Sequence, residues 1–205
     1  MNQFPRLEAL HHADEREGRL LVYREGLGYW RAEAPTDAIT DRTRRIFLGP
    51  GAFAINTGTP ARAFVGSSAT VTEDIDAWAF DGAAAEVLGT NAMMPSDWDG
   101  GAVTAVVHWA PSDTTAGNVY WQVYLASIAA AEQVDQAYAD VASIIVAAGG
   151  TADVKKSSSG SITLSSGTDP FLKCLIVRQA ADALDTYNAQ DAWFLGLEIQ
   201  YTADS

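Results

Sequence analysis

Cysteine, histidine and positive charge are scarce in this sequence. Of its 205 residues, one is cysteine, three are histidine and 13 are Lys or Arg, against 26 Asp or Glu. One cysteine excludes an internal disulfide, and the apolar neighbours of Cys174 favour a buried free thiol. No apolar run reaches about 18 residues, which excludes a membrane-spanning helix and predicts no membrane partner. The first residues lack the basic-then-apolar pattern of a signal peptide, so we expect synthesis in the cytoplasm.

The negative charge is concentrated in the second part of the chain. Residues 1–62 hold nine basic and eight acidic residues, whereas residues 63–205 hold four basic and 18 acidic residues. Proteins bind nucleic acid largely through Lys and Arg that neutralise phosphates, so an acidic body repels DNA and RNA. The same acidity also keeps a domain in solution. We therefore predict no nucleic-acid partner.

The sequence also lacks motifs for catalysis. It has no G-x-S-x-G sequence, no Walker motif and no dinucleotide-binding glycine motif. Its histidines, His11, His12 and His108, do not supply the three or four converging ligands that zinc needs. We predict that the protein is not an enzyme and uses no cofactor.

Two acidic stretches raise the question of a bound cation. Asp97, Asp99 and Gly100 begin like a calcium-binding loop, but His108 occupies the twelfth position, where such a loop carries glutamate. A corner turn, with glycine at a positive φ, explains these residues better. A second cluster either forms a solvated loop or holds a cation: Asp182, Asp185 and Asp191. We predict no metal site.

Short apolar segments separated by Gly, Asp, Asn and Ser fill the second part of the chain. Within 103–110 and 119–128 alternate residues are apolar, as expected for strands with one buried face. Such segments predict an all-β fold, a β-sandwich of the jelly-roll type. We expect a first strand near 63–65. Further strands are expected at 77–80, 84–88, 103–110, 119–128, 142–147, 153–155, 162–164, 171–178 and 192–201, with a short helical turn within 129–141. Trp109 and Trp121 are expected to form a cross-strand contact.

The N-terminal part has a different pattern. Apolar runs at 20–23 and 29–30 flank a loop with two glycines, which predicts a β-hairpin. An isolated hairpin is marginally stable in water, so we expect another chain to cover Tyr23 and Trp30. Arg42, Arg44 and Arg45 belong either to a solvated loop or to an anchor for an acidic surface, because arginine can grip carboxylates with two hydrogen bonds. We divide the chain into an N-terminal anchoring segment, 1–62, with the hairpin and an extended arm, and a jelly-roll domain, 63–205.

Four motifs follow one another in the second part: MPSDWDGG at 94–101, HWAPSDTTAGNVYW at 108–121, VDQAY at 134–138 and WFLGLEIQYT at 193–202. In this order they resemble the C-terminal jelly-roll domain of structural proteins of tailed phages, and the resemblance covers residues 75–202. The family resemblance implies a homotrimer on the surface of a virion, made in the host cytoplasm. We expect the trimer interface to include Tyr120, Tyr124 and Tyr201, on outward strand faces.

The resemblance implies a decoration (cement) or head-spike subunit that docks on the major capsid protein. We expect docking through Tyr23, Trp30, Arg42, Arg44 and Arg45. An alternative is a tail-fibre or receptor-binding subunit that recognises a glycan on the host surface. A third is a carbohydrate-binding module or an accessory domain of a hydrolase. The sequence has no long repetitive shaft of the fibre type, which favours decoration.

Overall fold

The computed structural model describes residues 20–24, 29–33, 42–65, 75–135, 137–138, 140–164, 171–187 and 190–203; among these, the side chains of 20–24, 29–33, Phe64 and Asp140 are not described. The chain forms two compact units, Met1–Arg42 with Ser205 and Thr43–Asp204. In the first unit, β1 (Leu20–Arg24) and β2 (Tyr29–Glu33) pair antiparallel. The predicted hairpin is therefore confirmed.

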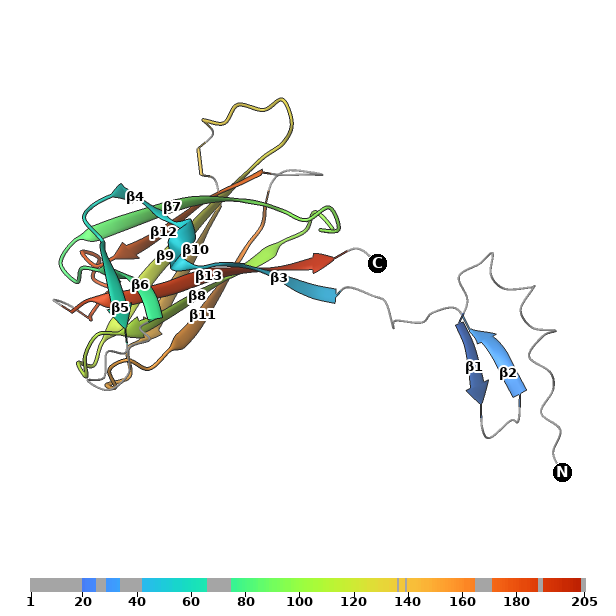
Figure 1. Ribbon diagram of the computed structural model, residues 1–205, viewed down its shortest axis with the longest axis horizontal. Coiled ribbons are helices and arrows are strands. Elements are labelled where there is room, and N and C mark those ends of the chain that lie inside the picture. Colours follow the sequence, from blue (N-terminus) through green and yellow to red (C-terminus); the bar gives the residue numbers. More distant parts are fainter. Residues whose placement is uncertain are drawn as a thin grey trace. The chain divides into compact units, whose positions relative to one another are not determined.

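Eight strands of the second unit form a jelly roll (Figure 1). They are β6 (Ile75–Phe80), β7 (Ala85–Met93), β8 (Val103–Pro111), β9 (Asn118–Ile128), β10 (Asp140–Ala147), β11 (Lys156–Ile162), β12 (Phe171–Gln179) and β13 (Ala192–Ala203). One sheet has the order β11-β8-β13-β6 and the other β10-β9-β12-β7, all antiparallel. Each half of the chain thus alternates between the two sheets, which is the double Greek key of a jelly roll. The predicted fold class is confirmed.

Three shorter strands extend these sheets: β3 (Arg42–Leu48), β4 (Ala54–Thr57) and β5 (Ala61–Val65), with a 3-10 turn at Pro50–Ala52. β3 pairs with β13, β4 with β7 and β5 with β6. Residues 43–62 are therefore part of the sandwich and not an extended arm, and the boundary between units lies at Arg42/Thr43 instead of 62/63. Glycines and prolines at 49–51 and 58–60 separate these short strands.

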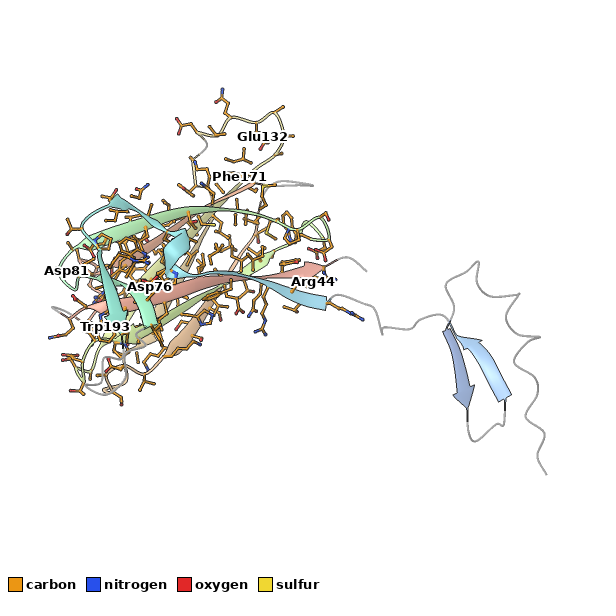
Figure 2. The ribbon with its side chains drawn as sticks, in the orientation of Figure 1. Arg44, Asp76, Asp81, Glu132, Phe171 and Trp193 are labelled. Atoms are coloured by element: carbon orange, nitrogen blue, oxygen red, sulfur yellow. The ribbon has the colours of Figure 1, made fainter. Side chains whose placement is uncertain are left out.

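Side chains fill the space between the two sheets (Figure 2). The buried core there is rich in aromatic residues. Trp109 and Trp121 are both fully buried, with ring centroids 6.1 Å apart. Because β8 and β9 belong to different sheets, this contact crosses the sandwich and is not the expected cross-strand pair. Phe80 and Phe194 pack against the Trp121 ring at 5.2 and 6.4 Å. Edge-to-face aromatic packing of this kind joins the sheets.

Two elements differ from the sequence prediction. Within 129–141 no helix forms among the described residues; a single turn occurs, in which the Glu132 N–H donates to the Ala129 carbonyl at 3.2 Å. Ala131 has φ 71°, a left-handed value that stops helical continuation. Instead of the two short strands expected at 153–155 and 162–164, the structure has one strand between them, β11. Its outward residues are serines, which hide its strand pattern.

Candidate functional site

The outer face of the β10-β9-β12-β7-β4 sheet carries a connected set of tyrosine and amide side chains. β9 supplies Tyr120, Gln122 and Tyr124, which share one face because side chains alternate along a strand. Ser143 lies opposite Gln122 on β10, and Gln179 lies on β12. We call these five residues the tyrosine platform.

Hydrogen bonds link all members of the tyrosine platform. The hydroxyl of Tyr124 and the amide of Gln179 both donate to Gln122 Oε1, at 2.7 and 2.5 Å. Gln122 Nε2 donates to the Tyr120 hydroxyl at 2.8 Å, which in turn donates to Ser143 Oγ at 3.2 Å. Such a satisfied network holds its side chains in fixed orientations. The result is a rigid, uncharged surface.

Exposed apolar residues border the tyrosine platform on β10, the strand at the end of this sheet. Val141 and Ile145 are 44% and 47% exposed. They lie opposite Tyr124 and Tyr120 in the register of β10 and β9. Exposed apolar residues beside an uncharged patch are typical of a binding surface.

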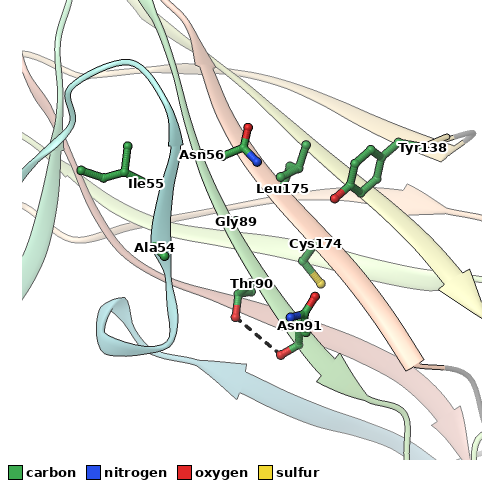
Figure 3. Close-up of a pocket in the computed structure, with 9 residues that line it drawn as sticks. All are labelled: Ala54, Ile55, Asn56, Gly89, Thr90, Asn91, Tyr138, Cys174 and Leu175. Atoms are coloured by element: carbon green, nitrogen blue, oxygen red, sulfur yellow. Dashed lines mark hydrogen bonds between the residues drawn. The ribbon is translucent and has the colours of Figure 1, made fainter. Parts of the chain in front are cut away.

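On the same face, but toward the β4 end of the sheet, a hollow of about 250 Å³ opens between β4, β7 and β12 (Figure 3). It is lined by Ala54, Ile55, Asn56, Gly89, Thr90, Asn91, Tyr138, Cys174 and Leu175. Gly89 leaves room at its floor, since a Cβ there would lie 3.3 Å from Leu175 Cδ2. The lining contains no Asp, Glu, Lys or Arg. The hollow therefore offers amide and hydroxyl groups over an apolar floor.

Tyr138 forms one wall of the hollow and is held by two contacts. Lys173 Nζ lies 4.8 Å from the centroid of the Tyr138 ring and donates to the Val134 carbonyl at 3.2 Å. The Tyr124 ring packs against Tyr138 with centroids 6.2 Å apart. Burial raises the pKa of Tyr138, so its hydroxyl is neutral at pH 7 and can both donate and accept a hydrogen bond.

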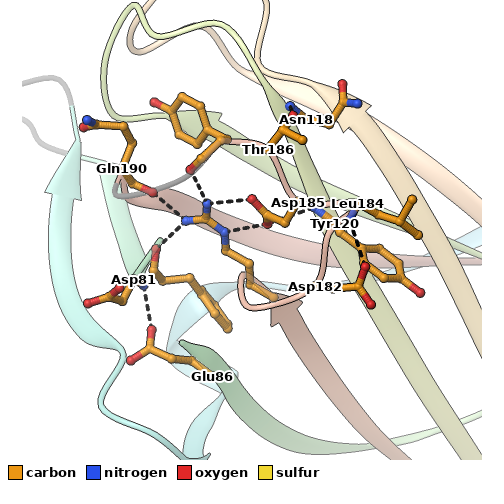
Figure 4. A network of polar contacts seen from close by, with 12 residues as sticks. Asp81, Glu86, Asn118, Tyr120, Asp182, Leu184, Asp185, Thr186 and Gln190 are labelled. Carbon is orange, nitrogen blue, oxygen red and sulfur yellow. Dashed lines mark hydrogen bonds and ion pairs between the residues drawn. The ribbon is translucent and has the colours of Figure 1, made fainter. Parts of the chain in front are cut away.

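The acidic cluster predicted as a possible cation site has a different role. Asp185 is buried and accepts hydrogen bonds from Arg178 Nε at 3.0 Å and Nη2 at 3.2 Å (Figure 4). The other guanidinium hydrogens go to the carbonyls of Phe80, Tyr187 and Gln190. The cation at this cluster is therefore the side chain of Arg178. This network joins the end of β6 to the loop before β13.

A serine, a histidine and an acid also meet on the outer face of the other sheet. His108 Nδ1 lies 2.8 Å from Ser157 Oγ, and His108 Nε2 lies 3.5 Å from Glu198. Ser157 also accepts a hydrogen bond from Lys155 at 2.9 Å, and Arg45 lies 3.6 Å from Glu198. Burial lowers the pKa of His108. We interpret this group as a polar contact that holds β3 on β13.

The corner at 97–101 is stabilised by its own protein contacts. Gly101 N–H donates to Asp99 Oδ1 at 2.8 Å, and Gly100 has φ 78°. Asp97 forms an ion pair with Arg44 at 2.6 Å. The described residues hold no group of three or more His, Cys, Asp or Glu that could bind a metal ion. Among them there is also no helix long and apolar enough to cross a membrane.

The predicted docking residues are distributed as follows. Tyr23 and Trp30 are opposite each other in the β1–β2 pair, but their side chains lie outside the described part. Arg42, Arg44 and Arg45 are exposed on β3. Arg44 and Arg45 form ion pairs within the sandwich, so they do not lie in a free arm as expected.

The predicted trimer residues do not share one surface. Tyr120 and Tyr124 lie on the outer face, in the tyrosine platform, where neighbouring side chains leave Tyr120 only 8% exposed. Tyr201 is 5% exposed and belongs to the core, because it lies on the inward face of β13. Its hydroxyl lies 3.3 Å from Asp97. The expectation that Tyr201 faces outward is therefore wrong.

Comparisons with known proteins give structural similarity only. No protein-family model and no curated protein sequence matches the chain. A family 35 carbohydrate-binding module from Clostridium thermocellum has TM-score 0.44 at 10% identity, covering 76% of this chain and 97% of that one. A family 11 module from the same organism, in complex with a mixed-linked tetrasaccharide, has TM-score 0.42 at 8% identity, covering 78% and 98%. A CBM36-1 domain of a xylanase from the hindgut metagenome of Trinervitermes trinervoides has TM-score 0.43 at 9% identity, covering 76% and 96%. At these values the similarity carries no argument about function.

Proposed function

We propose that this chain is a non-enzymatic surface protein of a tailed-phage-like particle, a decoration subunit that docks on the capsid. The observation that carries the proposal is the separate N-terminal unit with its two-stranded hairpin. Two strands alone are marginally stable in water and need a surface to pack on. The order of motifs in residues 75–202 supports the same function, because it resembles that of phage structural proteins.

In this proposal the N-terminal unit binds the major capsid protein and the acidic jelly roll projects from the shell. Tyr23, Trp30 and Arg42 remain the proposed docking residues. A subunit that binds the assembled lattice and not its loose parts stabilises the shell by mass action. Linking three such subunits raises their effective concentration at the surface.

We further propose that the protein is a homotrimer. The tyrosine platform and the exposed Val141 and Ile145 provide a rigid surface of mixed character for a second copy. Light scattering at micromolar concentration should give three times the 21.8 kDa of one chain. A species of 21.8 kDa alone would contradict the trimer.

The proposed location is tested on purified particles. Mass spectrometry of particles from cells that produce this protein should find it in a fixed ratio to the major capsid protein. Antibodies against the jelly roll should label intact particles on the capsid. Labelling of tail tips alone would instead favour the receptor-binding function.

Receptor binding is the second candidate function, and the hollow is the observation that favours it. An open, uncharged hollow with amide and hydroxyl groups is suited to a glycan on a host surface. The hollow lies on the β4 side of the sheet, whereas the proposed trimer contact lies on the β10 side. A glycan array probed with the full chain tests this function, and binding to no glycan would contradict it.

A further inference from the structure

We infer that the hollow between β4, β7 and β12 binds a single neutral sugar ring, a hexopyranose. This inference rests on the receptor-binding candidate and names its ligand class and its residues. The volume of about 250 Å³ lies just below the roughly 300–1,000 Å³ of pockets for drug-sized ligands. The hollow is therefore suited to one ring and not to a longer chain of sugars.

The polar groups of the hollow match a ring of hydroxyls. Asn56 and Asn91 each carry an amide, whose nitrogen donates and whose oxygen accepts, and Asn56 Oδ1 already accepts from Thr57 Oγ1 at 3.1 Å. The Asn91 amide has no hydrogen-bond partner in the part of the chain that the structure describes. A sugar hydroxyl also donates and accepts, so an amide can bind two neighbouring hydroxyls at once.

The apolar groups of the hollow match the C–H face of such a ring. Tyr138 presents an aromatic wall, and Leu175 provides the floor beside Gly89 (Figure 3). Aromatic rings bury apolar area at low entropic cost because they have few rotatable bonds. Tyr138 is also fixed by Lys173 and Tyr124, so little further ordering accompanies binding.

The charge of the surroundings selects a neutral ligand. No basic side chain lines the hollow, and residues 63–205 carry four basic against 18 acidic residues. An acidic sugar would be repelled by this field, and the Lys173 ammonium beside Tyr138 already donates to the Val134 carbonyl. The ligand is therefore an uncharged hexose unit.

The test is a titration of the ¹⁵N-labelled full chain followed by NMR. The probes are the methyl glycosides of glucose, galactose, mannose and N-acetylglucosamine, with N-acetylneuraminic acid as the charged control. At least one neutral probe should bind with a dissociation constant on the order of 1 mM, as expected for so few ligand atoms. Its largest shifts should fall on Asn56, Gly89 and Asn91, and the acidic sugar should cause none.

Two variants and one control locate the site. Asn91→Ala should weaken binding by about three- to tenfold, because one hydrogen-bonding side chain is lost. Gly89→Ala should weaken it by a similar factor, since the new methyl group occupies the floor of the hollow. Ser159→Ala, an exposed position on the other sheet, should leave affinity unchanged. Thermal melting of each variant shows that its fold is retained.

Each outcome is decisive. Weakening by both hollow variants and not by the control supports the inference. Binding that both variants leave unchanged, with shifts elsewhere, overturns the hollow as the site and leaves receptor binding intact. Absence of shifts with every neutral sugar overturns the inference and removes its support for receptor binding, while capsid docking is tested separately.

Discussion

Removal of the guanidinium of Arg178 should destabilise the jelly roll more than any exposed charge does. In Arg178→Met all five N–H donors are lost, and with them the hydrogen bonds to Asp185 and to three backbone carbonyls. Breaking a buried ion pair by removing one partner costs about 3–5 kcal/mol. The carbonyls left without donors add to this cost. We therefore expect the free energy of unfolding to fall by about 4 kcal/mol or more.

The assay is urea denaturation followed by tryptophan fluorescence, with thermal melting as a second measurement. For a chain of this size, about 4 kcal/mol corresponds to a decrease of about 8–16 °C in the melting temperature. The matched control is Arg44→Met, because the ion pair of Arg44 with Asp97 is half exposed and should contribute at most about 1 kcal/mol. Equal losses in the two variants would refute the reasoning.

Three further predictions concern single groups. Burial raises the pKa of Cys174 to about 12, so the folded protein should not react with Ellman's reagent at pH 8, whereas the urea-unfolded chain should react fully. Rapid reaction of the folded protein would contradict this. Gly117→Ala places a Cβ 2.5 Å from the Thr186 carbonyl oxygen and should lower folding stability by roughly 1–3 kcal/mol. The control Gly51→Ala meets no atom within 4 Å and should leave stability unchanged, so equal melting temperatures of the two variants would be inconsistent with this. Burial lowers the pKa of His108 below 6.5. The contribution of His108 to folding stability is therefore present above pH 6.5 and is lost as the pH falls through the lowered pKa. A His108 titration midpoint at or above 6.5, measured by NMR, would contradict this.

The fold could be predicted from local patterns in the sequence. Apolar residues alternate along β8 and β9, and turn residues follow Pro95. Both patterns depend only on neighbours in the chain, and the structure has the strands and the corner as expected. The sequence predicts the end of β5, but β4 cannot be found from local patterns because its pairing with β7 is not local. Short edge strands between glycines and prolines have the same composition as a linker.

The candidate sites depended on contacts that no local pattern contains. Arg178 lies in an apolar strand, and its partners come from the end of β6 and from the loop before β13. Asn56, Asn91 and Tyr138 reach the hollow from distant positions. Gly89, inside a strand, was the only local signal, since glycine there often marks a close approach of another group.

The most direct test of capsid docking is co-sedimentation with shells that lack this protein. The full chain and residues 43–205, the sandwich unit, are incubated separately with the same shells and centrifuged. Docking through the N-terminal unit predicts that the full chain pellets with the shells and residues 43–205 stay in solution. If the full chain also stays in solution, the protein is not a decoration subunit of those shells.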